Sequence, residues 1–214
     1  MIQLKIVIGS TRPGRAADKL MPWLLDRARE HRDFEVELLD LRDWPLPFFA
    51  ETAATVGDPA SPTYSQPLVR QWNLEIAKAD ALLFVTPEYN HSLPGVLKNA
   101  VDTVFASYAL RNKPAGFVGY SGGATAGVRA VEHLAQVCVE AEMVPLRDTV
   151  LFPMVHQAFG ADGQPKDPLA TVRLQILLDD LAWWGALLKA ARPTQLPPGK
   201  LRISKAMAAK LLPR

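Results

Sequence analysis

Five short apolar runs alternate along the chain with five longer segments whose apolar residues recur at helical spacing. The runs lie at 2–9, 34–41, 79–86, 114–121 and 143–152, and the helical segments at 15–30, 65–79, 94–106, 126–141 and 168–191. Runs this apolar are typical of parallel strands with both faces buried, and helices between them cover those faces. The pattern predicts an α/β fold, a five-stranded parallel sheet between two layers of helices.

The strand order expected for a chain of this size is 2-1-3-4-5, which makes the first, third and fourth strands neighbours. Their carboxyl ends lead into the loops GSTRPGR (9–15), TPEYNHS (86–92) and SGGATAG (121–127). Ligands of open parallel sheets bind at this edge, where the strand order reverses. We therefore expect these three loops to form one ligand site.

Composition limits the possible classes of protein. The chain has 214 residues, 49% of them hydrophobic and 21% charged, as in an ordinary globular protein. It shows no apolar run of membrane-spanning length and no secretory signal, so we expect a cytoplasmic protein with no membrane partner. A single cysteine, Cys138, excludes an intrachain disulfide and a cysteine-based zinc site, and we expect no metal.

Charge is unevenly distributed along the chain. Residues 192–214 carry six basic residues and no acidic one, which leaves 18 basic against 22 acidic residues elsewhere. A body with a net charge of −4 argues against a nucleic-acid surface. We expect one domain at 1–191 and a basic C-terminal extension at 192–214 that packs on its own or a neighbouring subunit. Trp183 and Trp184, within the last helical segment, are expected in the core or at an interface.

A proline-rich segment follows the second strand. It covers residues 43–62 and is too long to be a simple connection. We expect it to be either a functional loop or a subunit contact.

The first loop has the composition of a phosphate site. It leads from a strand to a helix N-terminus, where free N–H groups and the helix dipole favour an anion, and it holds Ser10, Thr11, Arg12 and Arg15. Arg15 and Ala16 stand where a nucleotide P-loop has Lys and Ser or Thr, and the dinucleotide fingerprint is missing. A terminal phosphate monoester fits this loop better than a nucleoside triphosphate or a dinucleotide, although such residues also cap helices.

The third loop raises an alternative function. Gly119 to Gly123 match G-x-S-x-G, the nucleophile elbow of serine hydrolases, and Asp148 and His156 follow in the order that a Ser121 triad needs. A hydrolase would leave the other two loops without a role, and that fold usually has more strands. Glycines here also let the backbone approach a flat ring closely.

The middle loop suits a planar heterocycle. Tyr89 offers a ring to stack on or cover a ligand, Asn90 an amide that donates and accepts, and Pro87 a fixed backbone. Glu88 is expected to form hydrogen bonds within the loop or to face a partner subunit. An isolated histidine such as His91 is more often structural than catalytic, and we assign no chemistry to it.

Together the three loops resemble one known family. The segments GSTRPGR, TPEYNHSLPGVLKNAVD and SGGATAG, in this order and spacing, are similar to the NADPH-dependent FMN reductases, flavodoxin-like proteins that include chromate, quinone and azo-dye reductases. The likeness covers about residues 2–190, and PEYN followed by LPGVLKNAVD is its most specific part. Arg15 stands where some relatives have a small hydroxyl residue.

The resemblance implies a role for each loop. The first would hold the FMN phosphate through Ser10, Thr11, Arg12 and Arg15; the second and third would line the isoalloxazine ring through Pro87, Glu88, Tyr89, Asn90, Ser121, Gly122 and Gly123. It also implies a homodimer or homotetramer with the flavin near the subunit interface.

The implied reaction passes hydride from NADPH or NADH to flavin N5 and then to a small acceptor such as a quinone, chromate, an azo compound or free flavin. The flavin carries this chemistry, so we name no catalytic side chain. An electron carrier of the flavodoxin type, or a flavin sensor, is the alternative. Such carriers usually dock through a strongly acidic face, which a body charge of −4 supports only weakly.

Overall fold

The computed structural model describes residues 1–58 and 61–192. Its strands and helices alternate as the sequence predicted. In chain order they are β1 (Ile2–Ile8), α1 (Ala17–Glu30), β2 (Phe34–Asp40), α2 (Ala53–Val56), α3 (Pro67–Lys78), β3 (Ala81–Pro87), α4 (Gly95–Phe105), β4 (Pro114–Tyr120), α5 (Val128–Glu140), β5 (Val144–Phe152), the 3-10 turn η1 (Val155–Gln157) and α6 (Leu169–Ala191).

The five strands form one sheet in the order β2-β1-β3-β4-β5, and every pairing is parallel. This confirms the predicted order. On β1, Ile6 lies between Leu38 of β2 and Leu83 of β3. The first, third and fourth strands are therefore neighbours, and their carboxyl ends lie at one edge of the sheet.

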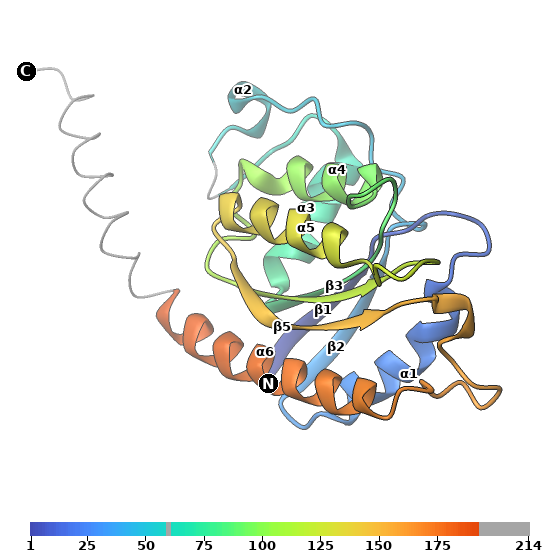
Figure 1. The fold of residues 1–214 in the computed structure, drawn as a ribbon. Coiled ribbons are helices and arrows are strands. Elements are labelled where there is room, and N and C mark those ends of the chain that lie inside the picture. Colours follow the sequence, from blue (N-terminus) through green and yellow to red (C-terminus); the bar gives the residue numbers. More distant parts are fainter. Residues whose placement is uncertain (59–60, 193–214) are drawn as a thin grey trace, which may run out of the picture.

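Helices cover both faces of the sheet (Figure 1). On one face α1 and α6 pack over alternate strand residues such as Ile6 and Leu83; on the other, α3, α4 and α5 pack over the intervening residues such as Val7 and Leu82. This division follows from the two-residue period of a strand, which sends successive side chains to opposite faces. The flavodoxin-like three-layer sandwich is confirmed.

A buried carboxylate at the amino edge of the sheet holds α6 in place. Asp80, just before β3, accepts hydrogen bonds from the Gln3 N–H at 3.0 Å and from Lys189 Nζ at 2.7 Å, and it pairs with Arg192. Burial by itself raises the pKa of Asp80, but these donors lower it below its ordinary value. Asp80 therefore links β1, β3 and the end of α6.

Some features of the structure differ from the sequence-based predictions or were not covered by them. The short helices α2 and η1 were not predicted from the sequence. Trp184 packs against the core, whereas Trp183 is 58% exposed. In the described part of the chain, no helix combines the length and apolar character needed to cross a membrane. Apart from Arg192, the predicted C-terminal extension lies outside the described residues, so its boundary and its packing stay predictions.

We expect the substitution Asp80→Asn to lower the free energy of unfolding by about 2 kcal/mol at pH 7, because it weakens a buried ion pair and its hydrogen bonds. The folded-state pKa of Asp80 lies below its unfolded value, so this stabilisation is present above the unfolded pKa and is lost as the pH falls through the folded one. Urea unfolding between pH 3 and pH 7 measures it. The control is Asp148→Asn, at a more exposed strand position whose one ion pair with a described residue is to the neighbouring Arg147. Equal effects of the two substitutions at pH 7 would contradict the role of Asp80.

Candidate functional site

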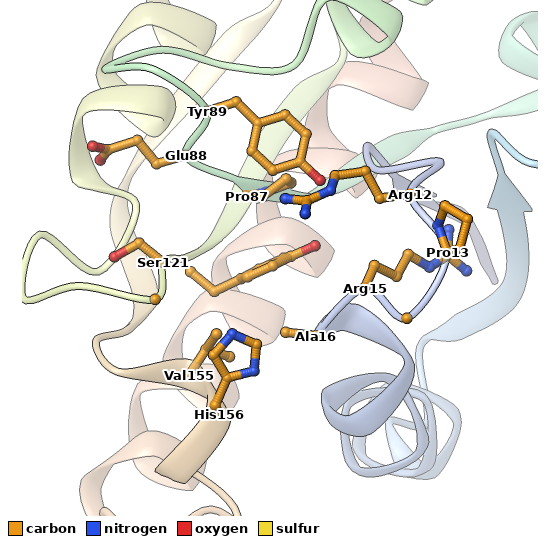
Figure 2. A pocket seen from close by; sticks show the side chains of 13 residues that line it. Arg12, Pro13, Arg15, Ala16, Pro87, Glu88, Tyr89, Ser121, Val155 and His156 are labelled. Atoms are coloured by element: carbon orange, nitrogen blue, oxygen red, sulfur yellow. The ribbon is translucent and has the colours of Figure 1, made fainter.

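Four loops meet at the carboxyl ends of β1, β3, β4 and β5 and enclose a cavity of about 240 Å³ (Figure 2). Three are the loops that the sequence singled out, and the fourth follows β5. The cavity is lined by Arg12, Pro13, Gly14, Arg15, Ala16, Pro87, Glu88, Tyr89, Tyr120, Ser121, Gly122, Val155 and His156. The strand order thus brings the three predicted loops together.

The predicted site residues divide into two groups. Seven line the cavity: Arg12, Arg15, Pro87, Glu88, Tyr89, Ser121 and Gly122. Four lie behind the lining or beside it: Ser10, Thr11, Asn90 and Gly123. Of these, Ser10 is fully buried, and its hydroxyl lies 2.7 Å from the Tyr89 hydroxyl, so it supports the wall of the cavity from within.

Arg12 brings a positive charge to the rim. Its guanidinium carbon lies 5.4 Å from the centre of the Tyr89 ring, and Figure 2 shows the two side chains next to each other over the cavity. Among the described residues no carboxylate forms an ion pair with Arg12. This cation, close to the N-terminus of α1, is available to an anionic ligand.

Arg15 is engaged differently. Its side chain is buried and forms a two-pronged ion pair with Asp40, at the end of β2, with one N–O distance of 2.6 Å; its Nε donates to Asp18 at 2.8 Å. The hydrogen bond to Asp40, followed by the one to Asp18, raises the pKa of Arg15 despite burial. Arg15 therefore fixes the first loop to β2. A contact of Arg15 with a phosphate stays a prediction, and the phosphate would have to compete with the carboxylates of Asp18 and Asp40.

The middle loop is a miniature hairpin. Tyr89 and Ser92 exchange backbone hydrogen bonds of 2.9 and 3.1 Å, and the two residues between them, Asn90 and His91, have φ values of 49° and 73°. Positive φ at both central positions is the requirement of a type I′ turn, and asparagine tolerates it best among residues with a side chain. The turn directs Tyr89 back toward the first loop.

Glu88 ties the middle loop to the next one. Its carboxylate is almost fully buried and accepts hydrogen bonds from Arg129 Nε of α5 at 2.7 Å and from Thr125 at 3.3 Å. These bonds, first that from Arg129, lower the pKa of Glu88. In Figure 2 the side chain points away from Arg12 and Arg15, so its carboxylate lies apart from the positive rim. The predicted hydrogen bonds of Glu88 are found, but with the third loop and α5 instead of within its own loop.

The third loop does not assemble a hydrolase site. The Ser121 hydroxyl donates to the Gly123 carbonyl at 2.8 Å and lies 3.3 Å from the Thr125 hydroxyl. Among the described residues, no hydrogen bond joins Ser121, Asp148 and His156 to one another, and Ser121 is not among those with the strained positive φ. A triad needs those contacts, so the match to G-x-S-x-G carries no nucleophile here.

Sequence reasoning missed Tyr120 and the fourth loop. Tyr120 is the last residue of β4; its buried hydroxyl lies near the Ser10 side chain but forms no well-aligned hydrogen bond with a described residue, and burial raises its pKa. His156 faces the cavity from η1, which is held to the third loop by a hydrogen bond from the Val155 N–H to the Ser121 carbonyl at 2.9 Å. A tyrosine ending an apolar strand is an ordinary strand residue in sequence, and only the place of β5 beside β4 shows that the fourth loop belongs here.

Comparison with known proteins identifies the family. Residues 2–157 match the family model described as NADPH-dependent FMN reductase. This chain belongs to that family. The chain therefore uses FMN with NAD(P)H, and the matched range includes the lining residues of all four loops of the cavity.

Individual relatives agree with this assignment. The chain is 36% identical over 152 residues to an NAD(P)H-dependent FMN reductase of Pseudomonas aeruginosa, covering 70% of this chain and 77% of the relative. It is 29% identical over 194 residues to a 2-hydroxy-1,4-benzoquinone reductase of a Burkholderia species, covering 86% and 96%. Among solved structures, FerB of Paracoccus denitrificans, a flavoenzyme NAD(P)H:(acceptor) oxidoreductase, matches with a TM-score of 0.70 and 26% identity over 87% of this chain and 98% of its own.

The residues of the cavity fit FMN. A phosphate suits the N-terminus of α1 and the cation of Arg12, with which no described carboxylate pairs. The buried hydroxyl of Tyr120 forms no well-aligned hydrogen bond with a described residue, and an oxygen of a ribityl phosphate would supply one, because a buried hydroxyl without a hydrogen bond is costly. The ring of Tyr89 offers a flat surface to a flat heterocycle.

Two glycines of the third loop are expected to respond differently to substitution by alanine, Gly127 in stability and Gly123 in ligand binding. Gly127 has a φ of +86°, and a Cβ there would lie 2.5 Å from the Tyr120 nitrogen, whereas a Cβ on Gly123 would meet no atom within 4 Å. We expect Gly127→Ala to lower the free energy of unfolding by about 2 kcal/mol or more. Gly123→Ala should leave it unchanged and weaken FMN binding if the ring lies against this backbone. Thermal unfolding and FMN fluorescence titration measure the two effects; unchanged FMN affinity of Gly123→Ala would exclude Gly123 from the ring contact.

Proposed function

We propose that this protein is an FMN-dependent NAD(P)H oxidoreductase that reduces small oxidising molecules, quinones first among them. The cavity at the carboxyl edge of the sheet carries this proposal. It joins a helix N-terminus, an aromatic surface and the cation of Arg12, with which no described carboxylate pairs, in a chain of the FMN reductase family. Relatives named as a quinone reductase of Pseudomonas putida and an FMN-dependent NADPH-azoreductase of Staphylococcus haemolyticus support this acceptor class. Chromate and free flavin are further acceptors to test.

In this proposal the side chains bind and orient. Arg12 and the N-terminus of α1 hold the phosphate, Tyr120 donates a hydrogen bond to an oxygen of the cofactor, and Tyr89 covers it from the middle loop. Arg15 keeps the first loop in place through Asp40. Bound FMN supplies the hydride-transfer chemistry that none of these side chains has.

The surface supports an enzyme better than an electron carrier. A protein that delivers electrons to other proteins gains from a strong docking charge, and the body of this chain carries only −4. The relatives and the solved structure named above are reductases or oxidoreductases. A carrier or flavin sensor is the outcome to consider if the bound flavin does not accept hydride from a nicotinamide.

We also propose a cytoplasmic homo-oligomer. Phe48, in the proline-rich segment, is 90% exposed, and Asn99 of α4 holds this segment by accepting from the Phe49 N–H at 2.8 Å and donating to the Pro47 carbonyl at 2.9 Å. A fully exposed aromatic side chain on a fixed loop suits a subunit contact. Sedimentation of the purified protein with and without Phe48→Ser tests it.

The first experiment follows the visible spectrum of the protein after FMN addition and desalting, and then after NADPH under anaerobic conditions. We expect retained flavin bands that bleach within the mixing time, followed by recovery when a benzoquinone is added. Boiled protein carried through the same steps is the control. Retained flavin that NADPH and NADH leave oxidised would favour the carrier or sensor, and absence of retained flavin would overturn the proposal.

The two arginines of the first loop should respond differently to substitution. We expect Arg12→Ala to weaken FMN binding about tenfold, the loss of one charge-assisted contact, without changing stability. Arg15→Ala should instead lower the free energy of unfolding by about 3 kcal/mol, because it leaves the Asp40 carboxylate without its partner. FMN titration and urea unfolding of both variants separate the effects, with exposed Arg147→Ala as control. An Arg15→Ala protein of normal stability and weakened FMN binding would restore Arg15 as a phosphate ligand.

A further inference from the structure

The outer face of α6 carries an apolar stripe that no described residue covers. Its members are 45–58% exposed and recur at helical spacing: Leu169, Val172, Ile176, Trp183 and Leu187. Single exposed apolar residues are common on proteins, but five of them along one face of a helix, interrupted only at Asp179 and Asp180, mark an interaction surface. The opposite side of the same helix packs on the sheet through residues such as Leu174 and Leu181.

Acidic groups accompany this stripe. Asp180 forms no ion pair with any described residue, and Asp179 accepts hydrogen bonds from Gln175 Nε2 at 2.9 Å and shares one of 3.0 Å with His31 Nε2. Next to Trp183 the surface has a hollow of about 410 Å³ whose wall includes Asp33 and Asp179. The stripe therefore suits an occupant that combines apolar and basic side chains.

A second copy of α6 is a poor occupant. Asp179 and Asp180 lie near the middle of the stripe, which extends from Leu169 to Leu187. Two such helices packed about a two-fold axis would bring the carboxylates of both copies together at the centre of the contact. Like charges at the centre of an interface cost several kcal/mol.

The chain's own extension has the required chemistry. Residues 193–214 contain five basic residues and no acidic one, together with apolar residues at 196, 201, 203, 207, 211 and 212. They follow directly on Arg192, which is fixed to Asp80 at the end of α6. Twenty-two residues reach about 70 Å when extended, whereas the 23 residues of α6 span about 35 Å. The extension is long enough to turn back and cover the whole stripe.

We propose that residues 193–214 dock on the outer face of α6 of the same chain, with apolar side chains on the stripe and basic side chains at Asp179 and Asp180. The stripe residues are not among those that line the cavity of the proposed flavin site, so this docking does not depend on that site. It gives the exposed Trp183 a partner and the basic extension a place.

Thiol labelling of the full-length protein with FMN added tests the docking. The native Cys138 is fully buried, and burial raises the pKa of its thiol to about 12, so an added surface cysteine reacts alone. Ala186→Cys places a thiol at the hollow beside the stripe, and Val139→Cys places one on α5, across the sheet. Each is combined with the extension variant K200E/R202E/K205E or with the control variant R70E/R147E/K166E, which has the same charge change at exposed positions.

We expect the extension variant to raise the labelling rate at Ala186→Cys at least about fivefold, the factor that corresponds to about 1 kcal/mol of docking. About 0.5 M salt should produce part of the same increase. Val139→Cys and the control variant should show no change. A rate unaffected by the extension variant would overturn the proposal. So would protection that depends on protein concentration, because it indicates the extension of a partner subunit.

Discussion

The pairing of β1 with β2 on one side and β3 on the other determines where the rest of this protein lies. The right-handed crossover from β1 to β2 places α1 on one face of the sheet, and the crossover from β2 back past β1 to β3 runs in the opposite direction and places α3 on the other (Figure 1). The loops after β1 and β3 therefore diverge above the sheet, and the space between them is the cavity. The site is a consequence of strand order before any of its side chains is considered.

Buried basic side chains connect neighbouring strands and helices of this arrangement through specific polar contacts. Lys5, in the middle of β1, is 1% exposed and pairs with Glu37 of β2 and Glu75 of α3. Lys113 donates to the Ile76 and Ala77 carbonyls, so it caps the end of α3, and burial lowers its pKa to about 7. Each of these groups connects two or three elements. They fix the positions of the strands and helices relative to one another more than they raise the free energy of unfolding, because the cost of removing each charge from water offsets much of the energy of its pairing.

The parts of the structure that the sequence predicted are those that local pattern determines. The strands, the main helices and their order follow from apolar runs and helical periodicity, and the loops stood out because their residues are unusual for plain connections. Contacts between segments far apart in the sequence could not be predicted from local pattern. The pairing of Arg15 with Asp40 depends on β1 lying beside β2, and the place of Tyr120 in the cavity depends on β4 lying beside β3. The G-x-S-x-G match left a hydrolase open as an alternative for the same reason, since a triad is a property of geometry.

The middle loop shows how polar side chains can fix the shape of a cavity wall. Asn90 and His91 occupy backbone conformations that cost residues with side chains about 1 kcal/mol or more, and the turn they form directs Tyr89 onto Ser10 and Arg12. Glu88, the most chemically suggestive residue of the loop, has one carboxylate oxygen bound by Arg129, and its side chain points away from Arg12 and Arg15. Its charge holds the loop against α5. A loop of this kind is constrained by shape more than by reactive groups. That is the arrangement expected where the cofactor brings the reactivity and the protein has to supply a fixed surface for it.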